Sequence, residues 1–196
     1  MKRKRTGTSK ATPSPAALRA ARPPGGRTAA AFAPGVKAMH GDGIAIRPAQ
    51  AADIAQVIAL DAQITGIEKS DYWRGIYQRF IKQRQQANEK DQFFLVAAAA
   101  AGADAGSVLG FIRGEIRAWE FGSAPCGWAY ALSVRPDARL RGIGQALLDG
   151  LTTEFRKSGV TRMRTMVARD NRLHLLFFRA SGMTAGPYIE LERDLR

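Results

Sequence analysis

The sequence predicts an α/β domain in which helices cover both faces of a mixed sheet. The first observation is a change of period: apolar side chains alternate from Trp128 to Val134, as in a strand, and recur at helical spacing from Ile143 to Phe155. The second is the order of the expected elements, which is strand, two helices, three strands, helix, strand, helix and strand. The third is composition, because 196 residues with 45% hydrophobic content suit one globular domain with an appendage.

The remaining elements follow from the same periodicities, and one Ala/Gly-rich loop between two expected strands marks a hairpin in the middle of the chain. We expect strands at Ile44–Arg47, Phe93–Ala99, Val108–Arg117, Thr161–Ala168 and Ile189–Leu195, and helices at Ala51–Ile64, Ser70–Ile81 and Arg172–Ser181.

The amino-terminal segment differs from the rest in charge. Residues 1–40 carry nine Lys or Arg and no acid, so most of the net charge of +13 lies there, and the remainder has 21 basic against 17 acidic side chains. Residues 1–43 hold hardly any large apolar residue, which predicts a disordered basic tail before a folded domain at 44–196. A nucleic-acid-binding arm, a targeting peptide and a solubilising extension all fit this composition, and we favour the last.

Composition also limits the classes of protein. No apolar run approaches the roughly 20 residues of a membrane helix, so no membrane partner is expected. The single cysteine, Cys126, excludes an internal disulfide, and with two distant histidines it offers no metal cluster. A cytoplasmic setting is the expectation, and a homodimer is one of the oligomeric states left open.

The loop between the central strand and helix is typical of an anion site. It reads Arg139-Leu140-Arg141-Gly142-Ile143-Gly144. Glycines at the entrance of a helix let the backbone approach a ligand, and the unpaired N–H groups there favour phosphate. An ordinary turn with incidental glycines is the alternative. A dinucleotide fingerprint would need a third Gly or Ala where Leu147 stands, and no P-loop sequence occurs.

Together with its flanking strand and helix, this loop resembles the acyl-CoA-binding motif of the GNAT acyltransferase superfamily. That motif, [Q/R]-x-x-G-x-[G/A], is filled by Arg139, Gly142 and Gly144. The resemblance extends from about Ile44 to the carboxyl terminus. It implies the GNAT fold, with six to seven strands, and an N-acetyltransferase that uses acetyl-CoA as cosubstrate without a metal. It places CoA against Leu132, Ser133, Val134, Arg139, Leu140, Arg141, Gly142, Ile143, Gly144, Gln145, Ala146, Asn171 and Phe178.

A second family element, N-x-x-A-I-x-L-Y followed by G-F, corresponds to the stretch from Asn171 to Phe178. Phe178 stands where the family often has a tyrosine that protonates the departing thiolate. A thiolate can also take a proton from water, so the change does not exclude activity. Tyr130, Tyr188 and Ser181 are alternative donors.

The resemblance implies direct attack of a neutral primary amine on the acetyl carbonyl, with a backbone N–H near Leu132 stabilising the oxyanion. A carboxylate is expected to accept the amine's proton, and Glu115 is the first candidate and Glu120 the second. Tyr130 and Asn171 complete the expected catalytic set. For each glutamate, a solvated or salt-bridged strand residue is the alternative role.

The acceptor is expected to be a small amine or a protein N-terminus. A polycationic acceptor would favour an acidic groove, and the nearly balanced charge of the domain indicates none. The helical region with Gly66, Glu68, Asp71 and Tyr72 should lie near the acceptor. Because of Phe178, a non-catalytic acyl-CoA-binding module is a second hypothesis. Nucleic-acid binding through the tail is a third, and we do not expect it.

Overall fold

The computed structural model describes residues 38–40, 43–86, 91–118 and 122–195. Most of the expected tail, 1–43, therefore lies outside the described residues. None of the described helices is long and apolar enough to cross a membrane. In chain order the elements are β1 (Ala38–His40), β2 (Ile44–Pro48), η1 (Ala51–Asp53), α2 (Ile54–Thr65), α3 (Ser70–Gln85), β3 (Gln92–Ala99), β4 (Val108–Arg117), β5 (Cys126–Val134), η3 (Pro136–Ala138), α4 (Ile143–Lys157), β6 (Met163–Thr165) and α5 (Arg172–Ala180).

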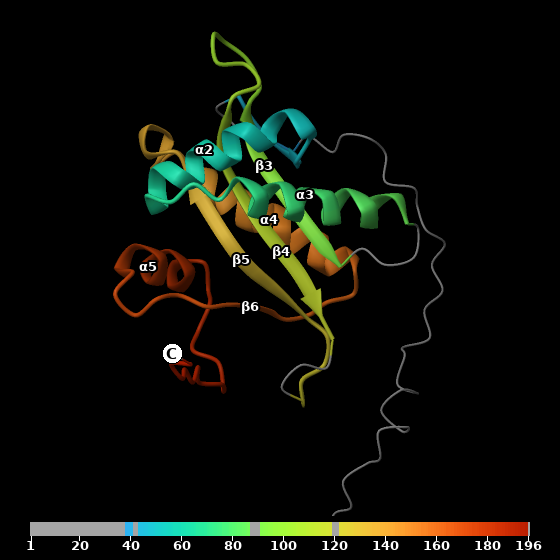
Figure 1. Cartoon of the computed structure of the whole chain (residues 1–196), viewed down its shortest axis with the longest axis vertical. Coiled ribbons are helices and arrows are strands. Elements are labelled where there is room, and N and C mark those ends of the chain that lie inside the picture. Colours follow the sequence, from blue (N-terminus) through green and yellow to red (C-terminus); the bar gives the residue numbers. More distant parts are fainter. Residues whose placement is uncertain (1–37, 41–42, 87–90, 119–121, 196) are drawn as a thin grey trace, which may run out of the picture. The chain divides into compact units, whose positions relative to one another are not determined.

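The strands form one mixed sheet in the order β1-β2-β3-β4-β5-β6 (Figure 1). Neighbouring strands run antiparallel, except that β5 and β6 are parallel. The five strands β2 to β6 were expected and form the body of the sheet. The short β1 pairs with β2 and lies within the range assigned to the tail.

The prediction of a final strand at Ile189–Leu195 is wrong. This strand was counted in the predicted sheet of six to seven strands, so the predicted make-up of that sheet is wrong as well. This segment is extended without strand pairing, and Ile189, Leu191 and Leu195 are more than four-fifths exposed. Its apolar alternation meets no apolar layer in the described part of the chain, so nothing selects one register. β6 is also shorter than the expected strand Thr161–Ala168.

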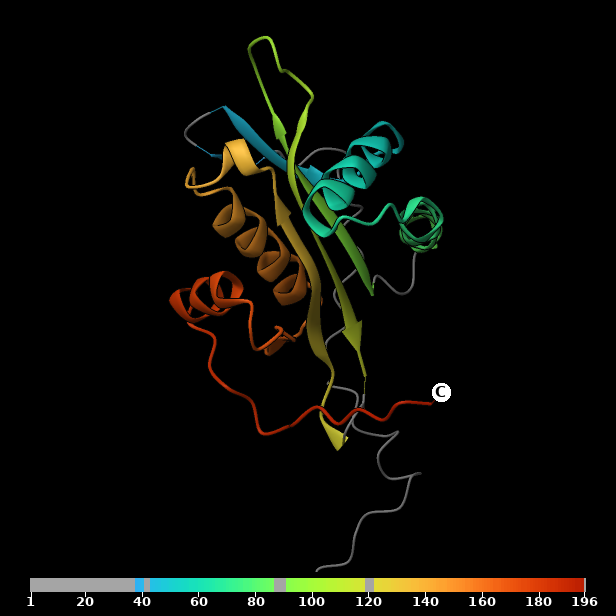
Figure 2. The same ribbon diagram turned by 60° about the vertical axis from the view of Figure 1, so that its left-hand side comes forward.

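Helices cover both faces of the sheet, as the sequence predicted. Helix α4 packs on one face, and α2 and α3 pack on the other (Figure 2). Each face has its own buried cluster, centred on Leu147 and Leu151 beneath α4 and on Trp73 and Phe94 beneath α3. The only cysteine, Cys126, is buried at the start of β5.

Three glycines of the sheet form the seat of α4. A Cβ atom at Gly127 would overlap the ring of Phe155, and one at Gly114 would lie 2.7 Å from a methyl group of Leu151. A Cβ atom at Gly110 would lie 3.2 Å from Leu147. Because all three positions lack a side chain, α4 sits close to β4 and β5 along most of its length.

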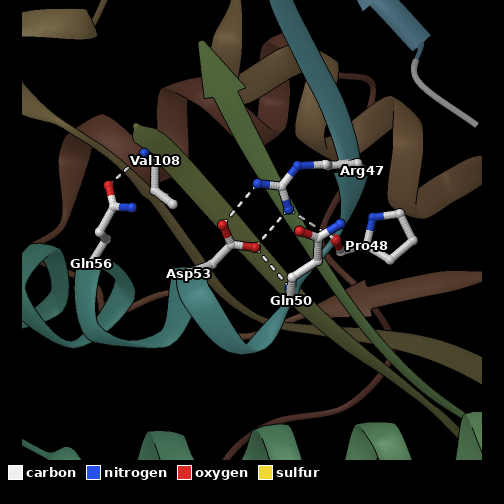
Figure 3. A network of polar contacts seen from close by, with 6 residues as sticks. All are labelled: Arg47, Pro48, Gln50, Asp53, Gln56 and Val108. Atoms are coloured by element: carbon white, nitrogen blue, oxygen red, sulfur yellow. Dashed lines mark hydrogen bonds and ion pairs between the residues drawn. The ribbon is translucent and has the colours of Figure 1, made fainter. Parts of the chain in front are cut away.

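A buried ion pair fixes the crossing from β2 to α2 (Figure 3). The Asp53 carboxylate is 2% exposed and accepts two hydrogen bonds from the Arg47 guanidinium, at 2.6 and 2.8 Å. It also accepts the Gln50 backbone N–H at 2.7 Å. The Arg47–Asp53 contact raises the pKa of Arg47 above its ordinary value, with the hydrogen bond as the main cause. This carboxylate is fully hydrogen-bonded, which makes its burial tolerable.

Two further polar contacts hold the helices on their face of the sheet. The Gln56 side chain on α2 accepts the backbone N–H of Val108 at 2.8 Å, so α2 is tied to the start of β4 (Figure 3). Asp61 on α2 accepts the indole N–H of Trp73 at 2.9 Å and pairs with Lys69 at 2.9 Å. The pair of helices is thereby fixed as one unit over β3 and β4.

The substitution Gly127→Ala is expected to lower the free energy of unfolding by about 1–3 kcal/mol, because the added methyl group must displace the Phe155 ring. That ring cannot move freely, since it packs edge-on against Phe93 at 5.2 Å. Urea denaturation of the variant measures the loss.

Gly75→Ala is the matched control for this prediction. Gly75 lies within α3, and its nearest non-neighbouring atom would be 3.6 Å from the new Cβ. Alanine should raise the stability there by about 0.5–1 kcal/mol, because it is the better helix former. Equal stability of Gly127→Ala and the wild type would contradict the close seating of α4.

Candidate active site

The parallel strands β5 and β6 stay paired for only three residues. Their register runs from Gly127–Met163 to Ala129–Thr165, where the Thr165 hydroxyl donates to the Ala129 carbonyl at 2.8 Å. Beyond this point β5 continues to Val134, and no described strand pairs with it on that side. The separation coincides with a β-bulge, because Arg113 and Gly114 of β4 oppose Ala131 and Ala129, which leaves Tyr130 as the extra residue.

The hydrogen-bond pattern shows which backbone groups of β5 face the open side. The Arg135 N–H donates to the Leu109 carbonyl on the β4 side, at 2.8 Å. In an antiparallel ladder such pairs alternate, so Ser133 also directs its N–H and C=O toward β4. Leu132 and Val134 therefore direct theirs to the side that β6 has left. This edge can accept an extended ligand as an added strand would be accepted.

The open edge leads into the loop before α4. Leu140 and Gly142 both have left-handed backbone conformations, with φ of 63° and 72°, and Leu140 is fully exposed. Gly142 is the N-cap of α4, and the first intrahelical bond runs from the Ala146 N–H to its carbonyl, at 3.0 Å. The preceding N–H groups of the first turn have no partner within the helix and are suited to an anion.

Helix α5 packs beside this turn. The Ser181 hydroxyl donates to the Gln145 side chain at 2.9 Å, and the ring of Phe177 lies near Gly144. Asn171 caps α5, because its side-chain oxygen accepts the His174 N–H at 3.1 Å. Phe178 is 7% exposed and belongs to the core beneath α4. The position of the missing tyrosine is thus a packing position.

The pKa of His174 depends on the charge in the loop before α4. Its ring lies against that of Phe178, at 6.2 Å between centroids. Desolvation lowers the pKa of His174 below its usual value of 6.5, and the positive charge of Arg139 lowers it further. The imidazole is therefore mostly neutral at pH 7, and it lies near enough to Arg139 to respond to charge placed at the loop.

The residues predicted to bind CoA lie in three segments. Three of them are near the end of β5, eight are in the loop and first turn of α4, and the last two are Asn171, the N-cap of α5, and Phe178 within α5. The side chains of Ile143, Ala146 and Phe178 are buried, so the first two can meet a ligand only through their backbone.

Two of the predicted catalytic residues lie together on the other face of the sheet. The Glu115 carboxylate pairs with Arg113 at 3.0 Å and with Arg117 at 3.7 Å, and the Arg113 guanidinium lies 4.9 Å from the centroid of the Tyr130 ring. Asn171 is not part of this group, because it caps α5 on the side of α4. Glu120 lies outside the described residues.

The residues expected near the acceptor have local structural roles. Gly66 ends α2 with a φ of 74°, and Glu68 accepts the Ser70 hydroxyl at 2.6 Å. Asp71 pairs loosely with Arg74 at 3.8 Å, and Tyr72 is half exposed.

The sequence reasoning missed a group that we call the arginine face, made up of Arg113, Arg117, Trp128, Tyr130 and Arg164. Trp128 and Tyr130 stack with 6.2 Å between ring centroids, and Arg164 lies 6.0 Å from the Trp128 ring. Arg113, Glu115 and Arg117 alternate along β4, and that period-two run of charges was the available signal. The contribution of β6 could be found only from the pairing of the strands.

Several solved acetyltransferase structures share this fold. The aminoglycoside acetyltransferase AAC(6')-Iy, in complex with a CoA bisubstrate analogue, matches with a TM-score of 0.64 and 16% identity over 77% of this chain and 97% of that one. AAC(6')-Ih from Acinetobacter baumannii matches with a TM-score of 0.60 and 16% identity over 79% and 100%. A metagenomic aminoglycoside acetyltransferase from soil, in complex with sisomicin, matches with a TM-score of 0.57 and 15% identity over 79% and 97%. At these identities the likeness concerns the fold.

The sequence comparison decides the family. The search of curated proteins found no match to this chain. Residues 61–183, more than half of the chain, match the profile described as the acetyltransferase (GNAT) family. This range holds the open edge of β5, the loop before α4 and helix α5. The chain therefore belongs to the acetyltransferase (GNAT) family of acetyl-CoA-dependent N-acetyltransferases.

Proposed function

We propose that this protein transfers the acetyl group of acetyl-CoA to a primary amine by direct attack in a ternary complex. The observation that carries the proposal is the departure of β5 from β6 at Ala129–Thr165, directly before the loop that opens α4. This arrangement joins an unpaired strand edge to a set of unpaired helix N–H groups.

Each part of the path suits one part of acetyl-CoA. The carbonyl of Leu132 and the backbone groups of Val134 would pair with the amide groups of the pantetheine arm. The N–H groups from Arg141 to Gln145 would bind the diphosphate, and Arg139 and Arg141 would add positive charge. Acetyl-CoA supplies the activated acyl group. Its thioester end would then lie near the bulge at Tyr130.

The polar groups for the reaction would come from β4 and β5. Glu115 would accept a proton from the ammonium group of the acceptor, directly or through a water molecule, and the neutral amine that results would attack the acetyl carbonyl. Arg113 and Arg117 pair with this carboxylate on the face of the sheet that α2 and α3 cover. The Leu132 N–H, which points to the open edge, would stabilise the oxyanion. Tyr130 at the bulge would be the proton donor for the thiolate, since Phe178 has no proton to give.

A non-catalytic CoA-binding module is the second candidate, because Phe178 is buried where the family often has a tyrosine. The two functions differ in one measurement. We expect the full chain to release CoA from acetyl-CoA in the presence of at least one member of a panel of primary amines. The Glu115→Gln variant should lower kcat by about 10²-fold, because it removes a positioned base.

The control for this assay is CoA affinity, measured by calorimetry. Glu115→Gln should leave it unchanged, since Glu115 does not lie on the path proposed for CoA. Tight binding of CoA without turnover of any amine by the wild type would favour the module.

The substitution Gly142→Val is expected to weaken CoA binding at least tenfold. A β-branched residue at a φ of 72° is strained, so the loop must rearrange and lose the aligned N–H groups. Calorimetric titration with CoA measures the change. Gly106→Val is the matched control, because Gly106 has a φ of 88° in the β3–β4 loop and equally open surroundings. A wild-type affinity for Gly142→Val would contradict the proposed site.

Bound CoA is expected to raise the pKa of His174. In the free protein this pKa lies below 6.5, because of desolvation and the charge of Arg139. Phosphate groups at the loop would offset the charge of Arg139 and favour the imidazolium, so the titration should move to higher pH. NMR titration of the histidine ring protons, with and without CoA, reports the shift. An unchanged His174 titration at saturating CoA would place the phosphates elsewhere.

A further inference from the structure

The arginine face crosses three strands near the place where the pairing of β5 with β6 ends. Glu115 of β4 lies opposite Trp128 of β5, which in turn lies opposite Arg164 of β6. Their neighbours along β4 and β5 lie on the opposite face of the sheet. A Cβ atom at Gly114 would meet Leu151 of α4, and Ile116 and Ala129 pack in the core beneath α4. Glu115, Trp128 and Arg164 therefore form one cross-strand row on the face of α2 and α3.

Neither α2 nor α3 covers this end of the sheet. In Figure 1 the lower ends of β4 and β5 extend past α3, and β6 lies beside them. Tyr130, at the bulge, is 40% exposed. The row is thus placed beside the region where the acetyl group would be transferred.

One charge of the arginine face has no opposite charge beside it within the residues that the structure describes. Arg113 and Arg117 pair with the carboxylate of Glu115 at 3.0 and 3.7 Å, so the unmatched charge is that of Arg164. Arg164 has no carboxylate within ion-pair distance among the described residues. Its guanidinium instead donates to the Ser123 hydroxyl at 3.1 Å and lies 4.7 Å from the Tyr188 ring and 6.0 Å from the Trp128 ring. A guanidinium stacked on rings still presents N–H groups at its edge, where an anion can bind.

Two buried N–H donors on this face also lack a partner in the described part of the chain. They are Arg113 Nε and Trp128 Nε1, and both side chains contact the Tyr130 ring. A buried donor without an acceptor costs free energy, and a ligand with acceptor oxygens would remove that cost. The face thus offers excess positive charge and unused donors at the same place.

We infer that the acceptor is a primary amine that also carries an anionic group, a carboxylate or a phosphate, and that this group binds the arginine face. The inference rests on the proposed function, since it assigns a binding site to the part of the acceptor that does not react. Its amine would reach the bulge at Tyr130 while its anionic group meets Arg164. A molecule with several amino groups, such as sisomicin, would instead be repelled by the three arginines.

The test uses amines that differ only in the anionic group. The full chain is assayed with acetyl-CoA and tyrosine against tyramine, then with phosphoethanolamine against ethanolamine, and with sisomicin. We expect kcat/KM of at least one member with an anionic group to exceed that of its counterpart without this group by tenfold or more, and sisomicin not to be acetylated. The two pairs distinguish a carboxylate from a phosphate. Equal values within both pairs, or preferred acetylation of sisomicin, would overturn the inference and leave the proposed function intact.

Variants then locate the effect. Arg164→Gln should reduce the ratio of kcat/KM within the preferred pair by about tenfold, through KM, because it removes a charge-assisted hydrogen bond. Arg156→Gln, an exposed arginine near the end of α4, should leave the ratio unchanged. An unchanged ratio in Arg164→Gln would contradict the assignment.

A binding measurement separates this inference from the proposed function. Calorimetry with the CoA-bound chain should show tighter binding of the anionic amine than of its counterpart, and the difference should fall in Arg164→Gln. If this holds while no amine is acetylated, the proposed catalysis fails and the anion site stands. If neither anionic amine binds, the anion site fails.

Discussion

Close contact between α4 and the sheet is the constraint on which the rest of the structure depends. The ring of Phe155 occupies the space that a side chain at Gly127 would need, and Leu151 does the same at Gly114. This seating determines where the amino-terminal end of α4 lies relative to β5. If the helix stood farther out, the N–H groups of its first turn would no longer continue the line of the open strand edge.

The bulge at Tyr130 has a comparable effect within the sheet. One extra residue in β5 changes which side chains face each way, so that Tyr130 and the next residue, Ala131, both lie on the face of α2 and α3. It also coincides with the end of β5–β6 pairing. The backbone of Leu132 and Val134 is therefore available to a ligand, and the neighbouring aromatic side chains are drawn together with Arg113.

The order of most elements, and the loop on which the proposed CoA site depends, could be predicted from the sequence, because both depend on local patterns. The change of period after Val134 and the spacing of Arg139, Gly142 and Gly144 can be seen in one short stretch. The strand expected at Ile189–Leu195 had the right alternation, but alternation alone provides no partner strand. The glycines beneath α4 and the arginine face escaped prediction, since each is assembled from strands distant in sequence.

Because Cys126 is buried, the reactivity of its thiol reports local unfolding of the protein. It is the only thiol of the chain, and it lies at 2% exposure where β5 begins, beside the glycine that receives Phe155. A thiol in such a place reacts with alkylating or oxidising agents only when the surrounding strands separate. Its modification rate would therefore follow the fluctuations of this edge of the sheet, and oxidative damage there would first require local unfolding.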